Sequence, residues 1–317
     1  VGAQLEGFDT MVHLTEENDF IVLEGDEYLS SPIDRRPKFH LYQPNIALIS
    51  GIAWDHINVF PTYENYVEQF EIFIGKITNG GILVYNEEDA EVKRVSKEAT
   101  NPIRKLPYHT PKYTVSNGVT LLETPEGDMP IEVFGAHNLN NLAGAKWICQ
   151  NMGVDEAEFY EAIASFKGAS KRLEKIAESK TKVAYKDFAH SPSKVAATTK
   201  AVKEQYPNRT LIACLELHTY SSLNAAFLKE YEGALEYADK AVVFYSPDAV
   251  KIKKLDEVSY DQIAAAFNRK DLIIYTNPIE FKDFLFKQDF DNSALLLMSS
   301  GNYGGLNFDE VKGLILD

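Results

Sequence analysis

The chain has 317 residues, 45% of them hydrophobic, and a formal net charge of −15. This length allows a large buried core and favours two domains over one. The negative charge argues against nonspecific binding to nucleic acid or to an anionic membrane, because clustered Lys and Arg side chains bind phosphate lattices. No apolar stretch approaches the roughly 20 residues that span a bilayer.

The two cysteines and the first residues bear on the cellular location. Cys149 and Cys214 lie within apolar stretches, so we expect free thiols in the core, as in a reducing cytoplasm. Residues 1–4 show neither a signal-peptide pattern nor an initiator Met. The sequence therefore predicts a cytoplasmic protein, here in a processed or truncated form.

The first half of the chain mixes strand and helix patterns. Residues 109–134 contain the turn sequences S-N-G and P-E-G-D and predict β-hairpins. Apolar runs and helical periodicity predict the other elements. The expected strands are residues 20–23, 46–49 and 82–85, and the expected helices are 62–77, 138–152 and 155–166.

Strands and helices alternate after Gly168, which predicts a doubly wound parallel sheet. The expected strands are 183–188, 211–215, 241–245, 272–275 and 295–298, and the expected helices are 193–205, 225–238, 260–267 and 278–286. We place the domain boundary within residues 166–169, so that residues 1–167 and 168–317 form two domains.

Polar residues follow the first two predicted strands. Glu24 comes directly after residues 20–23, and His56 follows residues 46–49. The carboxyl ends of strands in α/β sheets hold ligands and metal-binding acids. A solvated acid and a structural histidine are the plainer alternatives. Two adjacent strand ends that offer an acid and an imidazole to one site strengthen the metal interpretation, and the plainer alternatives stay open.

The segment G-A-H-N-L-N-N, residues 135–141, opens a predicted helix. Asn138 and Asn141 are three residues apart and share one helix face. Paired amides can bind the donor and acceptor edge of a base. Helix capping explains Asn138 but leaves Asn141 without a role.

Further candidate residues lie beyond the predicted boundary. The Arg172 guanidinium can donate two parallel hydrogen bonds and so suits a polyphosphate. A solvated basic pair with Lys171 is the more usual interpretation. Asp187 ends a predicted strand, where an acid can accept hydrogen bonds from a ribose. His190, His218 and the turn S-S-G-N-Y-G-G, residues 299–305, follow three strands of the same predicted sheet.

Taken in order, these motifs resemble the Mur ligase family, the ADP-forming amino-acid and peptide ligases of peptidoglycan assembly. The resemblance covers nearly the whole chain. It implies an α/β fold with a partial P-loop-type central domain, a mixed sheet with helices, followed by a Rossmann-like doubly wound C-terminal domain. The matching segments are E-G-D-E-Y, W-D-H, G-A-H-N-L-N-N, G-A-S-K-R-L-E and D-F-A-H-S-P.

The resemblance also implies roles for individual residues. Glu24 and His56 would hold Mg²⁺, and Asn138 and Asn141 would bind the adenine of ATP. Arg172 would contact the ATP phosphates and Asp187 the ribose. The incoming peptide would meet the following residues: His190, His218, Gly301, Asn302 and Gly304.

Within the family, D-E-Y-L-S-S-P-I-D-R-R-P-K-F-H is most similar to members that attach L-Ala-γ-D-Glu-meso-diaminopimelate to UDP-N-acetylmuramate in murein recycling. The implied reaction passes through an acyl phosphate. Three alternatives stay open, namely ligation of L-alanine, a degenerate module that only binds peptide, and a folylpolyglutamate synthase-like ligase. The oligomeric state is left open.

The sequence departs from the family pattern at several positions. Lys186 stands where the family usually has an acid, and Ser191 where it has a second histidine. Thr219 and Ser222 replace arginines. The family's G-x-x-G-K-[ST] loop does not occur. We therefore expect the chain to begin downstream of that loop and to have little ligase activity alone.

Overall fold

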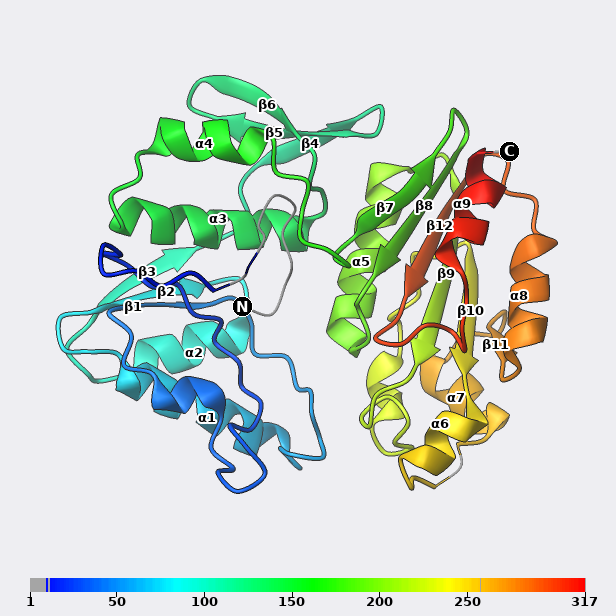
Figure 1. Ribbon diagram of the computed structural model, residues 1–317, viewed down its shortest axis with the longest axis horizontal. Coiled ribbons are helices and arrows are strands. Elements are labelled where there is room, and N and C mark those ends of the chain that lie inside the picture. Colours follow the sequence, from blue (N-terminus) through cyan, green and yellow to red (C-terminus); the bar gives the residue numbers. More distant parts are fainter. Residues whose placement is uncertain (1–9, 11, 257, 317) are drawn as a thin grey trace. The chain divides into compact units, whose positions relative to one another are not determined.

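The computed structural model describes residues 10, 12–256 and 258–316. The chain forms two compact units. The first unit comprises residues 1–114 and 121–170, and the second comprises residues 115–120 and 171–317 (Figure 1). The α/β class predicted from the sequence is confirmed. No helix in the described part of the chain is long and apolar enough to cross a membrane.

The first unit is built on a parallel sheet with the strand order β1-β2-β3. Its strands are β1 (Ile46–Ile49), β2 (Ile82–Asn86) and β3 (Arg104–Tyr108). Its helices are a 3-10 helix (Lys38–Leu41), α1 (Tyr63–Lys76), α2 (Ala90–Glu98), α3 (Ala136–Asn151) and α4 (Glu156–Ala164). Figure 1 shows α1 and α2 on one side of this sheet and α3 on the other.

Side chains explain where these helices begin. The Thr62 hydroxyl accepts the Asn65 N–H and caps α1, and the Asp89 carboxylate caps α2. Asp155 and Glu158 form a reciprocal capping box on α4. Such caps satisfy backbone donors that have no partner within the helix.

Alternating side chains of the sheet reach two separate cores. Ala47, Ile49 and Leu83 pack with the apolar faces of α1 and α2. Val84 and Tyr108 pack on α3 from the opposite face. A Cβ at Gly144 of α3 would lie 2.8 Å from Leu48 Cδ1, so glycine permits the close approach of α3 to the sheet.

A second sheet of three strands, in the order β4-β5-β6, confirms the expected β-rich region. Its strands are β4 (Tyr113–Ser116), β5 (Val119–Thr124) and β6 (Gly127–Ile131). The β4–β5 turn has Asn117 and Gly118 in the left-handed region, with φ of 51° and 77°. This matches the N-G turn signal in the sequence.

The second unit contains a six-stranded sheet in the order β11-β10-β9-β12-β8-β7, in which only the β7–β8 pair is antiparallel. Its strands are β7 (Glu174–Glu178), β8 (Lys182–Asp187), β9 (Thr210–Leu217), β10 (Lys240–Tyr245), β11 (Ile273–Tyr275) and β12 (Ser293–Met298). Its helices are α5 (Pro192–Gln205), a 3-10 helix (Leu228–Tyr231), α6 (Pro247–Ile252), α7 (Tyr260–Phe267), α8 (Pro278–Phe286) and α9 (Phe308–Leu316).

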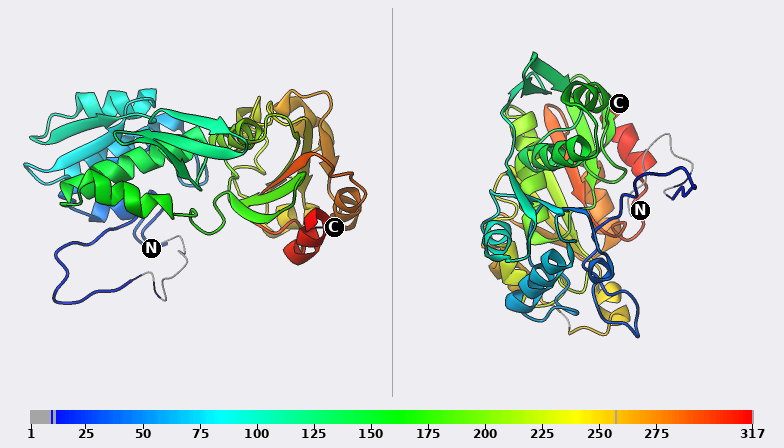
Figure 2. Two further views of the ribbon diagram at one scale, coloured as in Figure 1. Left: turned by 90° about the horizontal axis from the view of Figure 1, so that it is seen from above. Right: turned by 90° about the vertical axis from the view of Figure 1, so that its left-hand side faces the viewer.

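Helices cover both faces of this sheet, as Figures 1 and 2 show with α5 opposite α8 and α9. Every second residue of the strands, including Ile212, Cys214 and Leu297, joins the core beneath α8 and α9. The Thr199 hydroxyl of α5 lies 3.8 Å from the Met298 sulfur on the other face. Burial on both faces explains the continuous apolar runs of these strands.

Two predicted elements are wrong. Residues 20–23 form no strand, and the side chains of Phe20, Ile21, Val22 and Leu23 are 47–72% exposed. An apolar run becomes a strand only where a neighbouring strand pairs with its backbone, and the structure records no such partner for this run among the described residues.

The second error is the helix expected over residues 225–238. These residues form a series of turns with backbone bonds from residue i+3 to residue i, including Ala234 to Tyr231 and Ala238 to Leu235. Gly233, with φ of 75°, interrupts any α-helix. Apolar residues do recur every three to four positions in this segment, but the structure forms 3-10 turns there and not an α-helix.

Candidate active site

The first cluster of polar side chains in the first unit surrounds His56. The His56 Nε2 lies 3.6 Å from Glu27 Oε1. Tyr66 of α1 donates its hydroxyl to the same Glu27 oxygen at 3.3 Å. The Tyr28 ring meets the imidazole edge-on, with centroids 5.0 Å apart. Tyr66 and Tyr28 thus hold the Glu27 carboxylate and the His56 imidazole beside each other.

The backbone beside His56 is fixed by its neighbour. Asp55 is buried, and its Oδ1 accepts the His56 N–H at 2.7 Å. His56 has φ of 55°, a left-handed conformation that is uncommon for residues other than glycine. Burial, then Glu27 and Asp55, raise the pKa of Tyr66 well above its ordinary value, so this hydroxyl remains a hydrogen-bond donor.

Glu24 lies on an exposed part of the same segment. It adds to the raised pKa of Lys38, which comes chiefly from the hydrogen bond between Lys38 and Asp26 at 2.5 Å. In the structure, Glu27 rather than Glu24 lies beside His56, and the sequence did not mark Glu27. The expected geometry of two adjacent strand ends is wrong, because residues 20–23 are not a strand. The spacing of two acids three residues apart could have marked Glu27.

A divalent cation fits the donors of this cluster. Mg²⁺ is held by oxygen ligands and usually keeps several waters and substrate phosphates, so one or two protein carboxylates suffice. The described part of the chain contains no group of three or more His, Cys, Asp and Glu side chains arranged around one point. Mg²⁺ bound by the acids of residues 24–27 would therefore take its further ligands from water or from a substrate phosphate. The metal role of Glu24 and His56 stays a prediction.

The start of α3 holds the predicted amide pair. Asn138 is half-buried and donates its side-chain amide to the Phe134 carbonyl at 2.9 Å. Asn141 is exposed on the next turn. Asn140 between them is buried, and its amide donates to Asn86, Glu88 and Thr110. Asn140 therefore ties α3 to the end of β2, whereas Asn141 is open to a ligand.

His137 stands beside these amides. Burial lowers the pKa of its imidazole to about 4. The ring is therefore neutral at physiological pH, which suits the N-terminal end of a helix, where a positive charge is unfavourable.

Asp187 ends β8 and is buried. Its two oxygens accept the backbone N–H groups of Leu173 and Ala189, each at 2.6 Å. Burial raises the pKa of Asp187, while these two hydrogen bonds and the positive charges of Arg172 and Lys194 oppose the rise. The carboxylate is thus a brace for the backbone. Its predicted contact with a ribose is untested.

The brace at Asp187 fixes the segment that carries Arg172. Lys171 and Leu173 have φ of 60° and 44°, and the Phe188 N–H donates to the Lys171 carbonyl at 2.8 Å. The exposed Arg172 guanidinium stacks over the Phe188 ring, 5.3 Å from its centroid. Its fork remains available to an anion at the surface of the second unit.

The other predicted residues of the second unit lie at one edge of its sheet. Met298 of β12 is in register with Asp187 of β8 and with Leu215 of β9. His190, His218 and the turn of residues 299–305 therefore all follow the carboxyl ends of three adjacent strands. In open α/β sheets, this edge is where ligands bind.

His190 and His218 are held differently. The His190 ring is mostly buried, and its Nδ1 lies 2.7 Å from the Phe188 carbonyl oxygen. Tyr231 donates its hydroxyl to the His190 carbonyl. The His218 side chain is 38% exposed, with its Nδ1 3.7 Å from Glu216 Oε1. His218 is thus the more accessible imidazole.

The glycine turn is anchored by a buried tyrosine. The Tyr303 hydroxyl lies 2.7 Å from the Cys214 carbonyl oxygen and 2.8 Å from that of Met298. The Asn302 carbonyl accepts the Gly305 N–H at 3.0 Å. Tyr303 and Gly304 have φ of 53° and 71°, which a tight turn requires. Gly301, Asn302 and Gly304 are exposed.

The departures from the family pattern have local explanations. Lys186 pairs with Glu174 of the antiparallel strand β7 at 2.8 Å. The Thr219 and Ser222 hydroxyls lie 3.0 Å apart, and each accepts the backbone N–H of the other residue. These two hydroxyls therefore bond within the turn, and Ser222 is fully buried.

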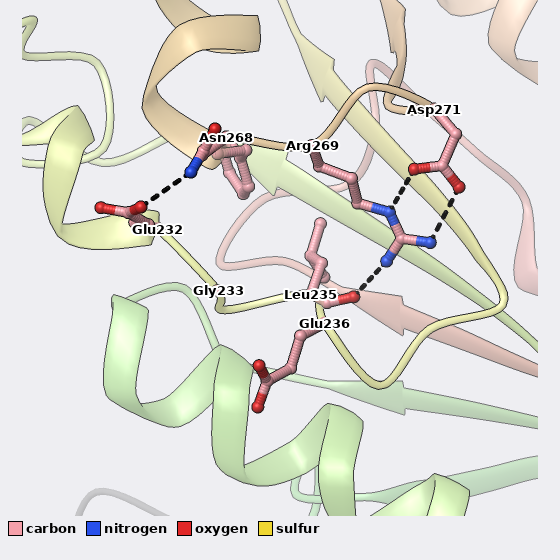
Figure 3. Close-up of a pocket in the computed structure, with 8 residues that line it drawn as sticks. Glu232, Gly233, Leu235, Glu236, Asn268, Arg269 and Asp271 are labelled. Carbon is pink, nitrogen blue, oxygen red and sulfur yellow. Dashed lines mark hydrogen bonds and ion pairs between the residues drawn. The ribbon is translucent and has the colours of Figure 1, made fainter.

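A cavity of about 480 Å³ lies at the opposite edge of the same sheet, before β10 and β11 (Figure 3). Arg269 closes one side, since it donates to the Leu235 carbonyl and to both oxygens of Asp271. Asn268 donates to Glu232 at 2.9 Å. None of the predicted site residues lines this cavity.

Comparison with known proteins shows what the chain is similar to. Residues 4–149 match the Mur ligase middle domain. The chain is 28% identical over 237 residues to UDP-N-acetylmuramate–L-alanine ligase of Caldicellulosiruptor bescii, covering 71% of this chain and 50% of that protein. The chain is thus similar to Mur ligases, and the resemblance predicted from its motifs is confirmed.

A second relative matches more of the chain. UDP-N-acetylmuramate–L-alanyl-gamma-D-glutamyl-meso-2,6-diaminoheptandioate ligase of Escherichia coli is 25% identical, covering 99% of this chain and 69% of that protein. The chain spans about half the length of the L-alanine ligases it matches.

Solved structures support the fold. A murein peptide ligase from Psychrobacter arcticus aligns with a TM-score of 0.62 at 17% identity, covering 96% of this chain and 65% of that one. A ligase from Thermotoga maritima, solved with ADP, also gives 0.62 at 17% identity, covering 86% of this chain and 61% of that one.

Proposed function

We propose that the protein containing this chain is an ADP-forming ligase that joins L-Ala-γ-D-Glu-meso-diaminopimelate to UDP-N-acetylmuramate, as a murein peptide ligase does. The observation that carries the proposal is the convergence of His190, His218 and the glycine turn at the carboxyl edge of one parallel sheet. The Escherichia coli relative, whose name gives this substrate pair, matches nearly the whole chain and supports the proposal.

The reaction has two steps in this proposal. The muramate carboxylate attacks the γ-phosphorus of ATP, forming an acyl phosphate while ADP leaves. The peptide amine then attacks the acyl carbon, phosphate leaves, and the amine loses a proton to solvent or to a base. Bound Mg²⁺ would supply charge neutralisation on the phosphates, with Glu24, His56 and the neighbouring Glu27 as its candidate protein partners.

The chain's own residues have the following parts in this proposal. Arg172 binds a phosphate oxygen through its guanidinium N–H groups. Asp187 contacts the ribose while it holds residues 171–173 in place. Asn138 and Asn141 bind adenine. The peptide contacts His190, His218, Gly301, Asn302 and Gly304. A cytoplasmic location accords with the two free cysteines and stays a prediction.

Ligation of L-alanine is the second candidate. It is favoured by the names of the relatives that share 27–28% identity with this chain. Lys186, Thr219 and Ser222, which depart from the family pattern, favour instead a module that binds peptide without catalysis. A folylpolyglutamate synthase shares the fold, with a TM-score of 0.57 at 14% identity.

Release of ADP by the full-length protein tests the proposal. ATP, Mg²⁺ and UDP-N-acetylmuramate are combined with the tripeptide, with L-alanine or with neither amine. We expect ADP release that requires the tripeptide and produces the muramoyl-peptide. ADP release with L-alanine alone would favour the second candidate. A protein that binds tripeptide but releases no ADP with any amine would be a non-catalytic module.

A further inference from the structure

Glu216 is a buried acid at the carboxyl end of β9. Its side chain is 3% exposed. A carboxylate removed from water is unfavourable unless hydrogen bonds or charges compensate it. The sequence motifs did not mark this residue.

Two residues of the glycine turn, Ser299 and Tyr303, depend on one oxygen of Glu216. Glu216 Oε2 accepts the Tyr303 N–H at 2.8 Å and also the Ser299 hydroxyl. The Ser299 oxygen in turn accepts the Gly301 N–H at 2.6 Å. The carboxylate therefore holds the backbone of residues 299–303 in one conformation, directly and through Ser299.

The other oxygen of Glu216 faces His218. Its Oε1 lies 3.7 Å from the His218 Nδ1, close enough to orient the imidazole electrostatically. Gly301 fills the space between the two side chains. A Cβ at Gly301 would lie 2.8 Å from Glu216 Oε2 and 3.0 Å from His218 Cγ. The acid, the imidazole and the turn thus form one packed unit.

We infer that Glu216 is a positioning residue of the amine-substrate site, which holds both the glycine turn and His218 in the geometry that receives the peptide. This inference rests on the proposed function. Glu216 itself is buried behind the turn and acts through the groups that it orients. A negative charge beside His218 also favours a substrate that approaches with an ammonium group, as an amine does before it loses its proton.

Kinetics of the full-length ligase separate positioning from general stability. Glu216→Gln keeps the size of the side chain but exchanges one acceptor oxygen for a donor. We expect the KM for the tripeptide to rise about tenfold, as for the loss of one charge-assisted hydrogen bond. The KM for ATP should stay within about twofold, since the adenine and phosphate contacts are elsewhere.

Further variants guard against a folding defect. Ser299→Ala removes one of the two links to the turn and should raise the tripeptide KM less than Glu216→Gln does. Glu216→Asp keeps the charge and should restore part of the loss. Glu236→Gln, beside the cavity of Figure 3, exchanges an acid at the opposite edge of the sheet and should leave all constants unchanged.

A structural measurement accompanies the kinetics. In the ¹⁵N NMR spectrum, the amide signals of Gly301 and Tyr303 should shift and exchange faster in Glu216→Gln than in Glu236→Gln. Unchanged amides or an unchanged tripeptide KM in an active enzyme would overturn the inference and leave the proposed function intact. A wild-type protein that ligates no amine would overturn the proposed function, and the inference with it.

Discussion

The two regions that hold the predicted functional residues differ in how firmly they are built. In the second unit, Asp187 ends a paired parallel strand, His190 and His218 follow such strands, and hydrogen bonds hold the Asp187 carboxylate and the His190 ring in place. In the first unit, Glu24 follows residues 20–23, which are exposed and unpaired in the described structure. The position of a strand residue is fixed by register only where the strand is hydrogen-bonded to a neighbouring strand.

The same difference explains why an acid other than the predicted one lies beside His56. Tyr66, on the firmly packed helix α1, reaches Glu27 and holds it against the imidazole. Glu24 has no comparable support, since it lies three residues earlier on an exposed segment. The acid that the family resemblance implies as a metal ligand, Glu24, is therefore not the acid that lies beside His56.

The largest expected effect concerns these two acids. In the full-length protein, we expect Glu24→Gln to lower kcat by roughly 10²–10³-fold, the cost of removing one preorganised electrostatic group. Glu27→Gln should cost less, because its hydrogen bond from Tyr66 marks a positioning role. ADP release measures kcat, and titration with Mg²⁺ measures metal affinity.

Glu17→Gln is the matched control, since Glu17 is another exposed acid of the same segment. The opposite ranking, with Glu27→Gln the more damaging of the two, would transfer the metal role to Glu27. Equal activity of all three variants would leave this region without a catalytic role.

The second prediction compares the stability of the paired sheet with that of the exposed run. Leu295→Ala in β12 creates a cavity at a fully buried position, and we expect it to lower the free energy of unfolding by about 2–5 kcal/mol. Leu23→Ala should change it by less than about 0.5 kcal/mol, because that side chain is 47% exposed.

Urea unfolding followed by circular dichroism measures both variants. A large loss of stability from Leu23→Ala would show that residues 20–23 are buried in solution, which would restore the strand that the sequence predicts.

Local patterns in the sequence predicted the paired elements well. Burial on both faces produces the apolar runs of β8, β9, β10 and β12, and these runs can be recognised without a structure. The run of residues 20–23 has the same composition and is not a strand, because pairing depends on a partner elsewhere in the chain. The sequence predicts a helix over residues 225–238 because the spacing of apolar residues does not distinguish 3-10 turns from an α-helix.

The candidate site was predicted in part for the same reason. His190, His218 and the glycine turn could be found because each follows a recognisable strand. Glu216 and Asn140 could not, since their importance lies in hydrogen bonds to residues more than 50 positions away in sequence, as from Asn140 to Asn86 and from Tyr303 to Glu216. Only the folded chain brings those partners together.

The third prediction concerns the pH dependence of the first unit. The pKa of His137 is about 4 in the folded chain and about 6.5 in an unfolded one. Between these values the unfolded state binds the extra proton, so the free energy of unfolding falls as the pH is lowered from 6.5 to 4. The loss from this residue is at most about 3 kcal/mol.

Tryptophan fluorescence can follow this loss in the first unit alone. The two tryptophans of the chain, Trp54 and Trp147, both belong to that unit. His137→Gln should flatten the pH dependence, whereas the exposed His109→Gln should preserve it. A wild-type curve that is already flat from pH 6.5 to pH 4.5 would show that His137 is not buried in solution.

The smallest effects come from glycines within helices, one in each unit. Gly75 of α1 and Gly313 of α9 have no atom near an added Cβ, so alanine at either position should raise the free energy of unfolding by about 0.5–1 kcal/mol. Tryptophan fluorescence reports on Gly75→Ala, and hydrogen exchange within α9 reports on Gly313→Ala.

Gly304→Ala should have the opposite sign. Its φ of 71° disfavours a side chain, and its added Cβ would lie 2.8 Å from the Pro278 Cβ. If Gly304→Ala proved neutral while Gly313→Ala was stabilising, the glycine turn would be free to change shape in solution. The carboxyl edge of the second sheet would then be no more firmly built than residues 20–23, because the turn is the part that Glu216 is inferred to hold.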